Sequence, residues 1–161
     1  MTLRHALLPL ALLAALPLSA QTQRGFTVRD MVALDRYSSP ALTPDGGVVV
    51  FAKRQMNSEV TKASTALWTR NLRTRDMAPP KRLTPEGWNV NSPTVSKDGK
   101  TVYFLSGKNG SSQLYAIPLA GGEPKQLTDL PLDVDAYQFA PDGHRVAVAM
   151  AAFPECKGDL A

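Results

Sequence analysis

One short turn motif occurs three times along this chain, and its spacing limits the folds that the chain can adopt. An Asp-Gly pair stands in each copy, followed by an apolar strand: Asp45-Gly46, Asp98-Gly99 and Asp142-Gly143. Successive turn aspartates lie 53 and then 44 residues apart. A repeat of roughly 40–45 residues made of short strands is typical of one blade of a β-propeller. The spacing therefore predicts an all-β fold.

Each copy of the motif predicts a β-hairpin. In the first copy Pro44 presets φ at the first turn position, Asp45 can accept a backbone N–H two residues on, and Gly46 suits the positive φ that follows. Lys97 takes the place of this proline in the second copy. The strands predicted around the three turns are 37–42 with 48–51, 90–95 with 101–105, and 136–139 with 146–149.

The second half of each unit repeats as well. Residues 66–72 match 113–119, a second hairpin follows each, and each ends in Leu-Thr, at Leu83-Thr84 and Leu127-Thr128. The first unit is longer, which an insertion at 56–64 mostly explains. Each unit is therefore predicted to be a four-stranded blade. We expect blade 1 at 37–84, blade 2 at 85–128, and the truncated start of blade 3 at 129–161, which makes about two and a half blades of a partial β-propeller.

The segment before the blades has two parts. Residues 1–20 are predicted to be a signal peptide: Arg4 and His5 precede the apolar stretch 6–16, which is too short for a bilayer, and Ala20 suits a cleavage site. An uncleaved anchor is the alternative. Residues 21–36 are predicted to contain a short helix at 26–36, capped by Thr27 with Asp30 at N3, whose apolar side packs on the sheet edges. The mature protein is expected to be periplasmic or secreted, with no stable insertion in a membrane.

The predicted number of blades affects the solubility of the chain on its own. A blade covers its faces only against neighbouring blades, so two and a half blades leave one sheet face and several strand edges open. We expect the isolated chain to be poorly soluble or oligomeric. The coding sequence after Ala161 would show whether further blades follow.

Catalytic chemistry is not visible in these residues. The chain has no Gly-x-Ser-x-Gly elbow, and its two histidines are His5 in the leader and His144 beside a turn, so no Ser-His-Asp triad is predicted. No catalytic, cofactor-binding or metal-binding residue is assigned, and no cofactor is expected. The net charge of +4 is small, so no nucleic-acid partner is expected. A solvated face explains the basic stretch better than a phosphate site does: Arg70, Arg73, Arg75, Lys81 and Arg82.

Other polar and aromatic residues allow more than one interpretation. The turn aspartates Asp45, Asp98 and Asp142 fit a structural role better than calcium binding, because they follow the repeat. An exposed loop is favoured over a cation site for a second acidic set: Asp129, Asp133 and Asp135. Trp68 is predicted to pack in the core, whereas Trp88 in a connection is left open as a stacking residue. A lone cysteine in an exported protein, Cys156, suggests a disulfide partner beyond residue 161.

The stretch 26–40, running into 43–46, resembles the start of the propeller in the prolyl oligopeptidase family of serine peptidases. Within the family the acylaminoacyl-peptidase and dipeptidyl-aminopeptidase-like bacterial members are the nearest, and the segments 127–131 and 153–156 resemble the exported ones. The resemblance covers about residues 26–161.

This resemblance implies a propeller that gates the access of short peptides to a C-terminal α/β-hydrolase domain. That domain would carry the Ser-Asp-His triad and bind the peptide substrates, and it is absent from this chain. The chain alone is therefore expected to be inactive. The alternative is a non-catalytic periplasmic propeller module that binds protein partners.

Overall fold

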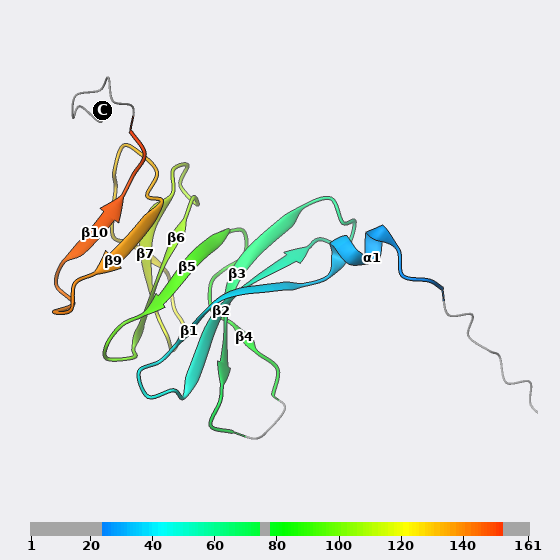
Figure 1. Cartoon of the computed structure of the whole chain (residues 1–161), viewed down its shortest axis with the longest axis horizontal. Coiled ribbons are helices and arrows are strands. Elements are labelled where there is room, and N and C mark those ends of the chain that lie inside the picture. Colours follow the sequence, from blue (N-terminus) through cyan, green and yellow to red (C-terminus); the bar gives the residue numbers. More distant parts are fainter. Residues whose placement is uncertain (1–23, 75–77, 153–161) are drawn as a thin grey trace, which may run out of the picture.

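The computed structural model describes residues 24–74 and 78–152, which form three antiparallel sheets in a row and one helix (Figure 1). The first sheet contains β1 (Arg36–Leu42), β2 (Val48–Met56), β3 (Ala63–Asn71) and β4 (Lys81–Arg82). The second contains β5 (Val90–Val95), β6 (Thr101–Ser106), β7 (Gln113–Pro118) and β8 (Lys125–Gln126). A hairpin of β9 (Ala136–Phe139) and β10 (Val146–Ala149) follows. The predicted all-β fold of about two and a half four-stranded blades is confirmed.

The hairpin turns form as their residues predict. In the first turn the Asp45 carboxylate accepts from the Thr43 hydroxyl at 2.6 Å and from the Gly47 N–H at 2.8 Å. Gly46 has a φ of 67°, and its N–H donates to the Thr43 carbonyl at 2.8 Å. Asp98 accepts the equivalent backbone bond from Lys100 at 3.1 Å. The side chain of the aspartate therefore replaces water for backbone groups that the turn leaves unpaired.

A β-bulge interrupts the inner strand of each complete sheet. It lies at the Ser-Pro pair, where Ser39 and Ser92 have φ values of 52° and 50° and the register shifts. Proline cannot donate to the ladder, so within strands it is found at edges and bulges. In β9 Tyr137 takes the place of the proline, and the ladder with β10 is continuous. The bulge is thus present in the two copies that carry the Ser-Pro pair and absent from the third, which has Ala136-Tyr137 there.

The main core lies between the first and second sheets. Val50, Ala52 and Leu67 from the first sheet pack against aromatic and branched residues of the second, and all are buried. Trp88, in the connection between the sheets, packs edge-on against Tyr115 with ring centroids 5.1 Å apart. The buried residues of this cluster from the second sheet are Val90, Val102, Phe104, Tyr115 and Ile117.

A smaller core joins the second sheet to the hairpin. Its buried members are Leu105, Leu114 and Val134. Half-buried residues of β9 and β10 pack against them, and the rings of Tyr103 and Phe139 have centroids 4.1 Å apart. The second sheet is therefore covered on both faces, while the first sheet is covered on one.

The short helix α1 (Val28–Ala33) precedes β1 and carries the predicted capping box of Thr27 and Asp30. None of its residues is buried, and Met31 is 50% exposed. The prediction that its apolar side packs on the sheet edges is therefore wrong. Its link to the first sheet is polar, because Arg29 donates to the Glu59 carbonyl at 3.0 Å. Among the residues described, no helix is long and apolar enough to cross a membrane. The predicted signal peptide and Cys156 lie outside the described residues.

Candidate functional site

The turn aspartates hold the turns together. Asp45 also pairs with the Arg73 guanidinium at 2.7 Å, and Asp142 with Arg145 at 3.0 Å. The Thr43 hydroxyl bond lowers the pKa of Asp45, and the Ser96 hydroxyl does the same for Asp98. Their oxygens serve the chain itself, which favours the structural interpretation. In residues 24–74 and 78–152 no three His, Cys, Asp or Glu side chains gather as a metal site would require.

The second acidic set is divided among different contacts. The Asp133 carboxylate accepts from the Ser112 backbone N–H, and the Asp135 N–H donates to the Ala149 carbonyl at 2.9 Å. Asp129 lines a polar pocket on the second sheet. These residues follow one another along the connection into β9, and the contacts of Asp133 and Asp135 fix that connection in place.

The two tryptophans lie in different environments. Trp88 packs in the main core. Trp68 lies on the opposite face of the first sheet, so its predicted place in the core is wrong. Its ring is half-buried, with the Lys53 ammonium 4.8 Å from the ring centroid and no hydrogen-bond partner for its buried Nε1. Strand alternation identifies two faces, but it does not say which of them a neighbouring sheet covers.

The remaining polar candidates serve the fold or lie at its surface. His144 is exposed, and its backbone N–H donates to Asp142 at 2.9 Å. Within the basic stretch, Arg73 pairs with Asp45, and Arg82 Nε donates to the Thr84 carbonyl at 3.1 Å. Arg75 lies outside the described residues. These contacts add no support to a phosphate site.

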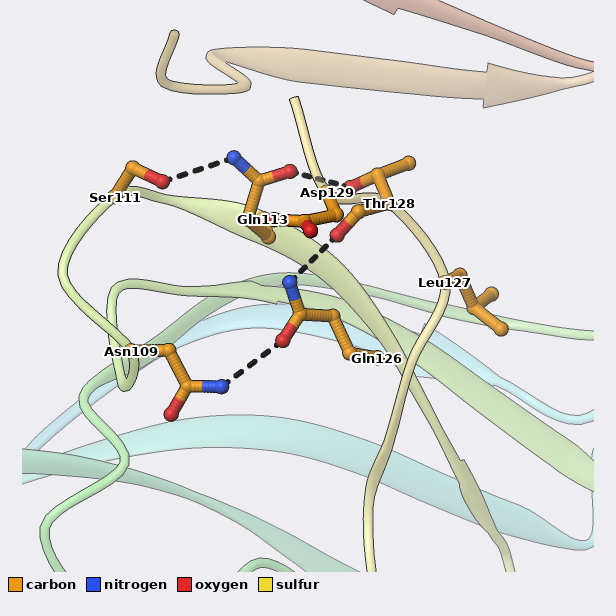
Figure 2. A pocket seen from close by; sticks show the side chains of 7 residues that line it. All are labelled: Asn109, Ser111, Gln113, Gln126, Leu127, Thr128 and Asp129. Atoms are coloured by element: carbon orange, nitrogen blue, oxygen red, sulfur yellow. Dashed lines mark hydrogen bonds between the residues drawn. The ribbon is translucent and has the colours of Figure 1, made fainter. Parts of the chain in front are cut away.

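A polar pocket of about 450 Å³ lies where the β6–β7 loop meets β8 and the connection after it. Figure 2 shows the Gln113 amide between the hydroxyls of Ser111 and Thr128, and the Asn109 amide donating to Gln126. The residues that line it are Asn109, Ser111, Gln113, Gln126, Leu127, Thr128 and Asp129.

Gln113 is the best-satisfied side chain of this pocket. It is 1% exposed, and its amide nitrogen also donates to the Leu130 carbonyl at 3.0 Å and the Leu132 carbonyl at 3.2 Å. Its amide oxygen accepts from the Thr128 hydroxyl at 2.8 Å and the Leu130 N–H at 3.1 Å. A buried amide with these partners acts as an internal strut, because each bond replaces one to water. Sequence reasoning missed Gln113. The matching position of the first unit is Ala66, and this difference between the repeats was the available signal.

A larger hollow of about 780 Å³ lies between the second and third hairpin turns. Lys97, which replaces the proline of the other turns, donates from Nζ across the hollow to the Pro141 carbonyl. On the inner side, the Tyr137 hydroxyl donates to the Ser92 carbonyl at 2.7 Å, and burial raises the pKa of Tyr137 to about 12. These contacts join neighbouring blades. The lining contains carboxylates, Lys97 and one imidazole, and the Ser96 hydroxyl that donates to Asp98 at 2.6 Å is part of the hairpin turn.

The first two sheets are four-stranded, antiparallel and packed face to face, which is the arrangement of neighbouring blades in a β-propeller. Residues 66–151 match the family described as the dipeptidyl peptidase IV (DPP IV) N-terminal region. The chain belongs to this family, and the resemblance to the propeller of prolyl-oligopeptidase-type peptidases is confirmed.

Relatives and a solved structure agree with this assignment. The chain is 31% identical over 130 residues to the uncharacterized peptidase YuxL of Bacillus subtilis, covering 78% of this chain. It is 33% identical over 135 residues to dipeptidyl-peptidase 5 of Porphyromonas gingivalis, covering 83% of this chain. An acylaminoacyl peptidase in complex with Z-Gly-Gly-Phe-chloromethyl ketone has the same fold over 74% of this chain and 18% of its own, with a TM-score of 0.59 and 17% identity. The chain spans 19% of the length of each of the two curated relatives.

Proposed function

We propose that these residues form the N-terminal propeller portion of an exported serine peptidase, and that the propeller restricts access to a separate hydrolase domain. The domain would cleave short peptides by acyl transfer through a Ser-Asp-His triad. The blades would admit a short peptide and exclude a folded chain. This chain contributes the wall of the chamber and none of the reacting groups.

The observation that carries the proposal is the match to peptidases along most of this chain but only 19% of their length. The side chains that line the pockets agree with this proposal. The polar atoms of Gln113 and Tyr137 form hydrogen bonds to neighbouring loops and strands. These bonds hold the sheets rigidly in place. A rigid wall is what size selection requires.

The first experiment asks which polypeptide carries the activity. An antibody against residues 24–152 should capture from the source cells a protein several times larger than 17.4 kDa. That protein should react with a fluorophosphonate probe and hydrolyse dipeptidyl chromogenic substrates, while the purified 161-residue chain should do neither. A captured protein of propeller size that ignores the probe would support the binding-module alternative. Turnover by the 161-residue chain that survives His144→Ala would overturn the proposal.

The second experiment tests gating in the captured peptidase. Phe104→Ala should loosen the packing of the first two blades, because Phe104 is fully buried between them. We expect cleavage of a 30-residue peptide to rise relative to cleavage of a dipeptidyl substrate by roughly tenfold, a barrier change of about 1.4 kcal/mol. Lys108→Ala, at an exposed residue of the β6–β7 loop, is the control. An unchanged ratio with Phe104→Ala would argue against a gate.

Export of the protein is tested by a separate measurement. Cell fractionation followed by N-terminal sequencing should find the mature protein outside the cytoplasm, with Gln21 at its N-terminus. A cytoplasmic protein that begins at Met1 would show that the leader prediction is wrong without affecting the peptidase assignment.

A further inference from the structure

The hollow between the second and third hairpin turns has the size of a binding site. Its volume is about 780 Å³, and the two turns that border it lie side by side at one end of their sheets (Figure 1). A volume of this size is typical of a site for a small molecule or for the end of a peptide. Within the described chain, the lining comes only from β5, β6, β9 and the two turns.

The hollow does not depend on further strands of the third blade. In the first two sheets the third strand pairs with the second strand and lies away from the first. A third strand of the last blade would therefore pair with β10 on the side away from β9, and so away from the hollow. The space is bordered by two hairpins that are both complete in this chain.

The side chains at this junction are larger than those at the junction of the first and second blades. There, Val50 is buried in the main core and Val95 packs against it. Tyr103 and Phe139 stand at the matching distances from their turn aspartates. Their rings have centroids 4.1 Å apart, and Tyr137 meets Phe139 edge-on. Two rings in place of two valines need more room between the blades, and they give the hollow an aromatic wall.

Lys97 brings a positive charge to this aromatic space. It replaces the proline of the other two turns, and its Nζ donates to the Pro141 carbonyl. An ammonium group has three N–H donors, so two remain for a ligand. Lys97 forms no ion pair within residues 24–74 and 78–152. Its charge is therefore available to an anionic group.

The two carboxylates of the lining are matched by other cations. Asp142 forms its ion pair with Arg145 at 3.0 Å, and Lys97 stabilises the ionised Asp142 without pairing with it. Asp98 accepts the backbone N–H of Lys100 at 3.1 Å, and the positive charge of Lys100 also stabilises the ionised form. With each carboxylate matched in this way, the charge of Lys97 is the one left over.

We propose that this hollow binds the carboxyl-terminal aromatic residue of a short peptide, with the carboxylate on Lys97 and the ring against Tyr103 and Phe139. A charge-assisted hydrogen bond to the ammonium group fixes the chain end. Contact between rings favours an aromatic side chain over an aliphatic one. The inference rests on the lining residues alone and does not require that the larger protein is a peptidase.

The test compares two peptides of nearly equal shape, acetyl-Ala-Phe and its carboxyl-terminal amide. Isothermal titration calorimetry measures their affinities for the whole protein that the antibody captures, after treatment with the fluorophosphonate probe to stop hydrolysis. The free acid should bind at least about tenfold more tightly than the amide, because only the acid pairs with an ammonium group. Acetyl-Ala-Leu should bind roughly threefold or more weakly than acetyl-Ala-Phe. Equal affinities of the acid and the amide would overturn the proposal.

A substitution at Lys97 assigns the difference to the hollow. Lys97→Gln should weaken binding of the acid by at least about tenfold and leave binding of the amide unchanged, so that the two peptides bind alike. Lys108→Gln, at an exposed lysine of the β6–β7 loop, is the matched control and should keep the difference. Thermal unfolding checks that each variant is folded, and Lys97→Met replaces Lys97→Gln where that variant is not. A difference that persists in Lys97→Gln, or is lost in Lys108→Gln, would contradict the assignment.

Discussion

The first and second sheets share a strand order, a bulged inner strand and a turn, yet their environments differ. The second sheet is packed on both faces, against the first sheet on one side and the hairpin on the other. The first sheet is packed on one. As a result equivalent aromatic residues are buried in the second sheet and half-exposed in the first. The stability of a blade therefore depends on its neighbours more than on its own strand pattern.

A second difference lies in the connections that leave the two sheets. The Leu-Thr pair has the same role in both, since the Thr84 and Thr128 hydroxyls accept the N–H groups of Leu67 and Leu114 at 2.9 Å. Gln113 then adds further bonds to the connection after the second sheet, and Ala66 adds none after the first. The stable part of a blade is thus common to the repeats, and the connection is where they diverge.

The largest effect is expected from the paired phenylalanines. Phe104→Ala should lower the free energy of unfolding by about 3–5 kcal/mol, because it leaves a cavity in a packed core. Phe51→Ala should cost roughly 1 kcal/mol, since that ring is only half-buried. Urea unfolding, at a concentration where the chain is monomeric, gives both values. Equal losses would mean that the face of the first sheet that holds Phe51 is covered in solution.

The next effect concerns Gln113 and its hydrogen bonds to the connection after the second sheet. Gln113→Ala should lower the free energy of unfolding by about 2–3 kcal/mol, because the Leu130 N–H and the Thr128 hydroxyl lose their acceptor. Gln138→Ala removes an exposed amide of the same type and should change stability by less than about 0.5 kcal/mol. Urea unfolding again supplies the comparison, and hydrogen exchange at Leu130 locates the loss. Similar values for the two glutamines would show that the connection is not fixed by Gln113.

A double-mutant cycle sharpens the contrast between the connections. Thr128→Val and Gln113→Ala remove the two ends of one hydrogen bond, so their effects should fall short of additivity by about 1 kcal/mol. Thr84→Val lies in the first sheet and should add to Gln113→Ala within about 0.5 kcal/mol. Four unfolding curves are needed for each cycle. Equal coupling in both cycles would contradict the separation of the two connections.

The turns should show a smaller difference. Gly99 has a φ of 70°, and a Cβ built there would lie 3.5 Å from Pro44 Cδ in the preceding turn. At Gly46, with a φ of 67°, a Cβ would meet nothing within 4 Å. Gly99→Val should therefore cost about 1 kcal/mol or more from backbone strain, and Gly46→Val should cost less, because only at Gly99 would the valine methyls extend beyond a Cβ that already contacts Pro44. Thermal unfolding of the two variants tests the order, and a reversed order would argue against contact between the turns.

The sequence predicts the parts of this structure that depend on local chemistry. The hairpins follow from Asp45 and Gly46, and the capping box follows from Thr27 and Asp30. It does not predict the features that depend on which surfaces meet. Trp68 and Tyr115 occupy matching strand positions, and only the presence of a preceding sheet decides which is buried. The role of Gln113 is hidden for the same reason, because its partners become neighbours only when the connection folds back.

The smallest effect concerns acid. The Ser96 hydroxyl is the main cause that lowers the pKa of Asp98 below its usual 3.8, and Ala140 leaves the third turn without an equivalent hydroxyl. A lowered pKa in the folded state means that the stabilisation is present above the unfolded pKa and is lost as the pH falls, here between about pH 5 and pH 2. Ser96→Ala should therefore raise the pKa of Asp98 toward 3.8 and flatten the loss of stability in acid. Ala140→Ser should add the missing hydroxyl to the third turn and so lower the pKa of Asp142. Carboxyl titration by NMR measures both pKa values. If the pKa of Asp98 is unchanged in Ser96→Ala, the backbone N–H of Lys100, rather than the hydroxyl, is the main cause of the lowered pKa.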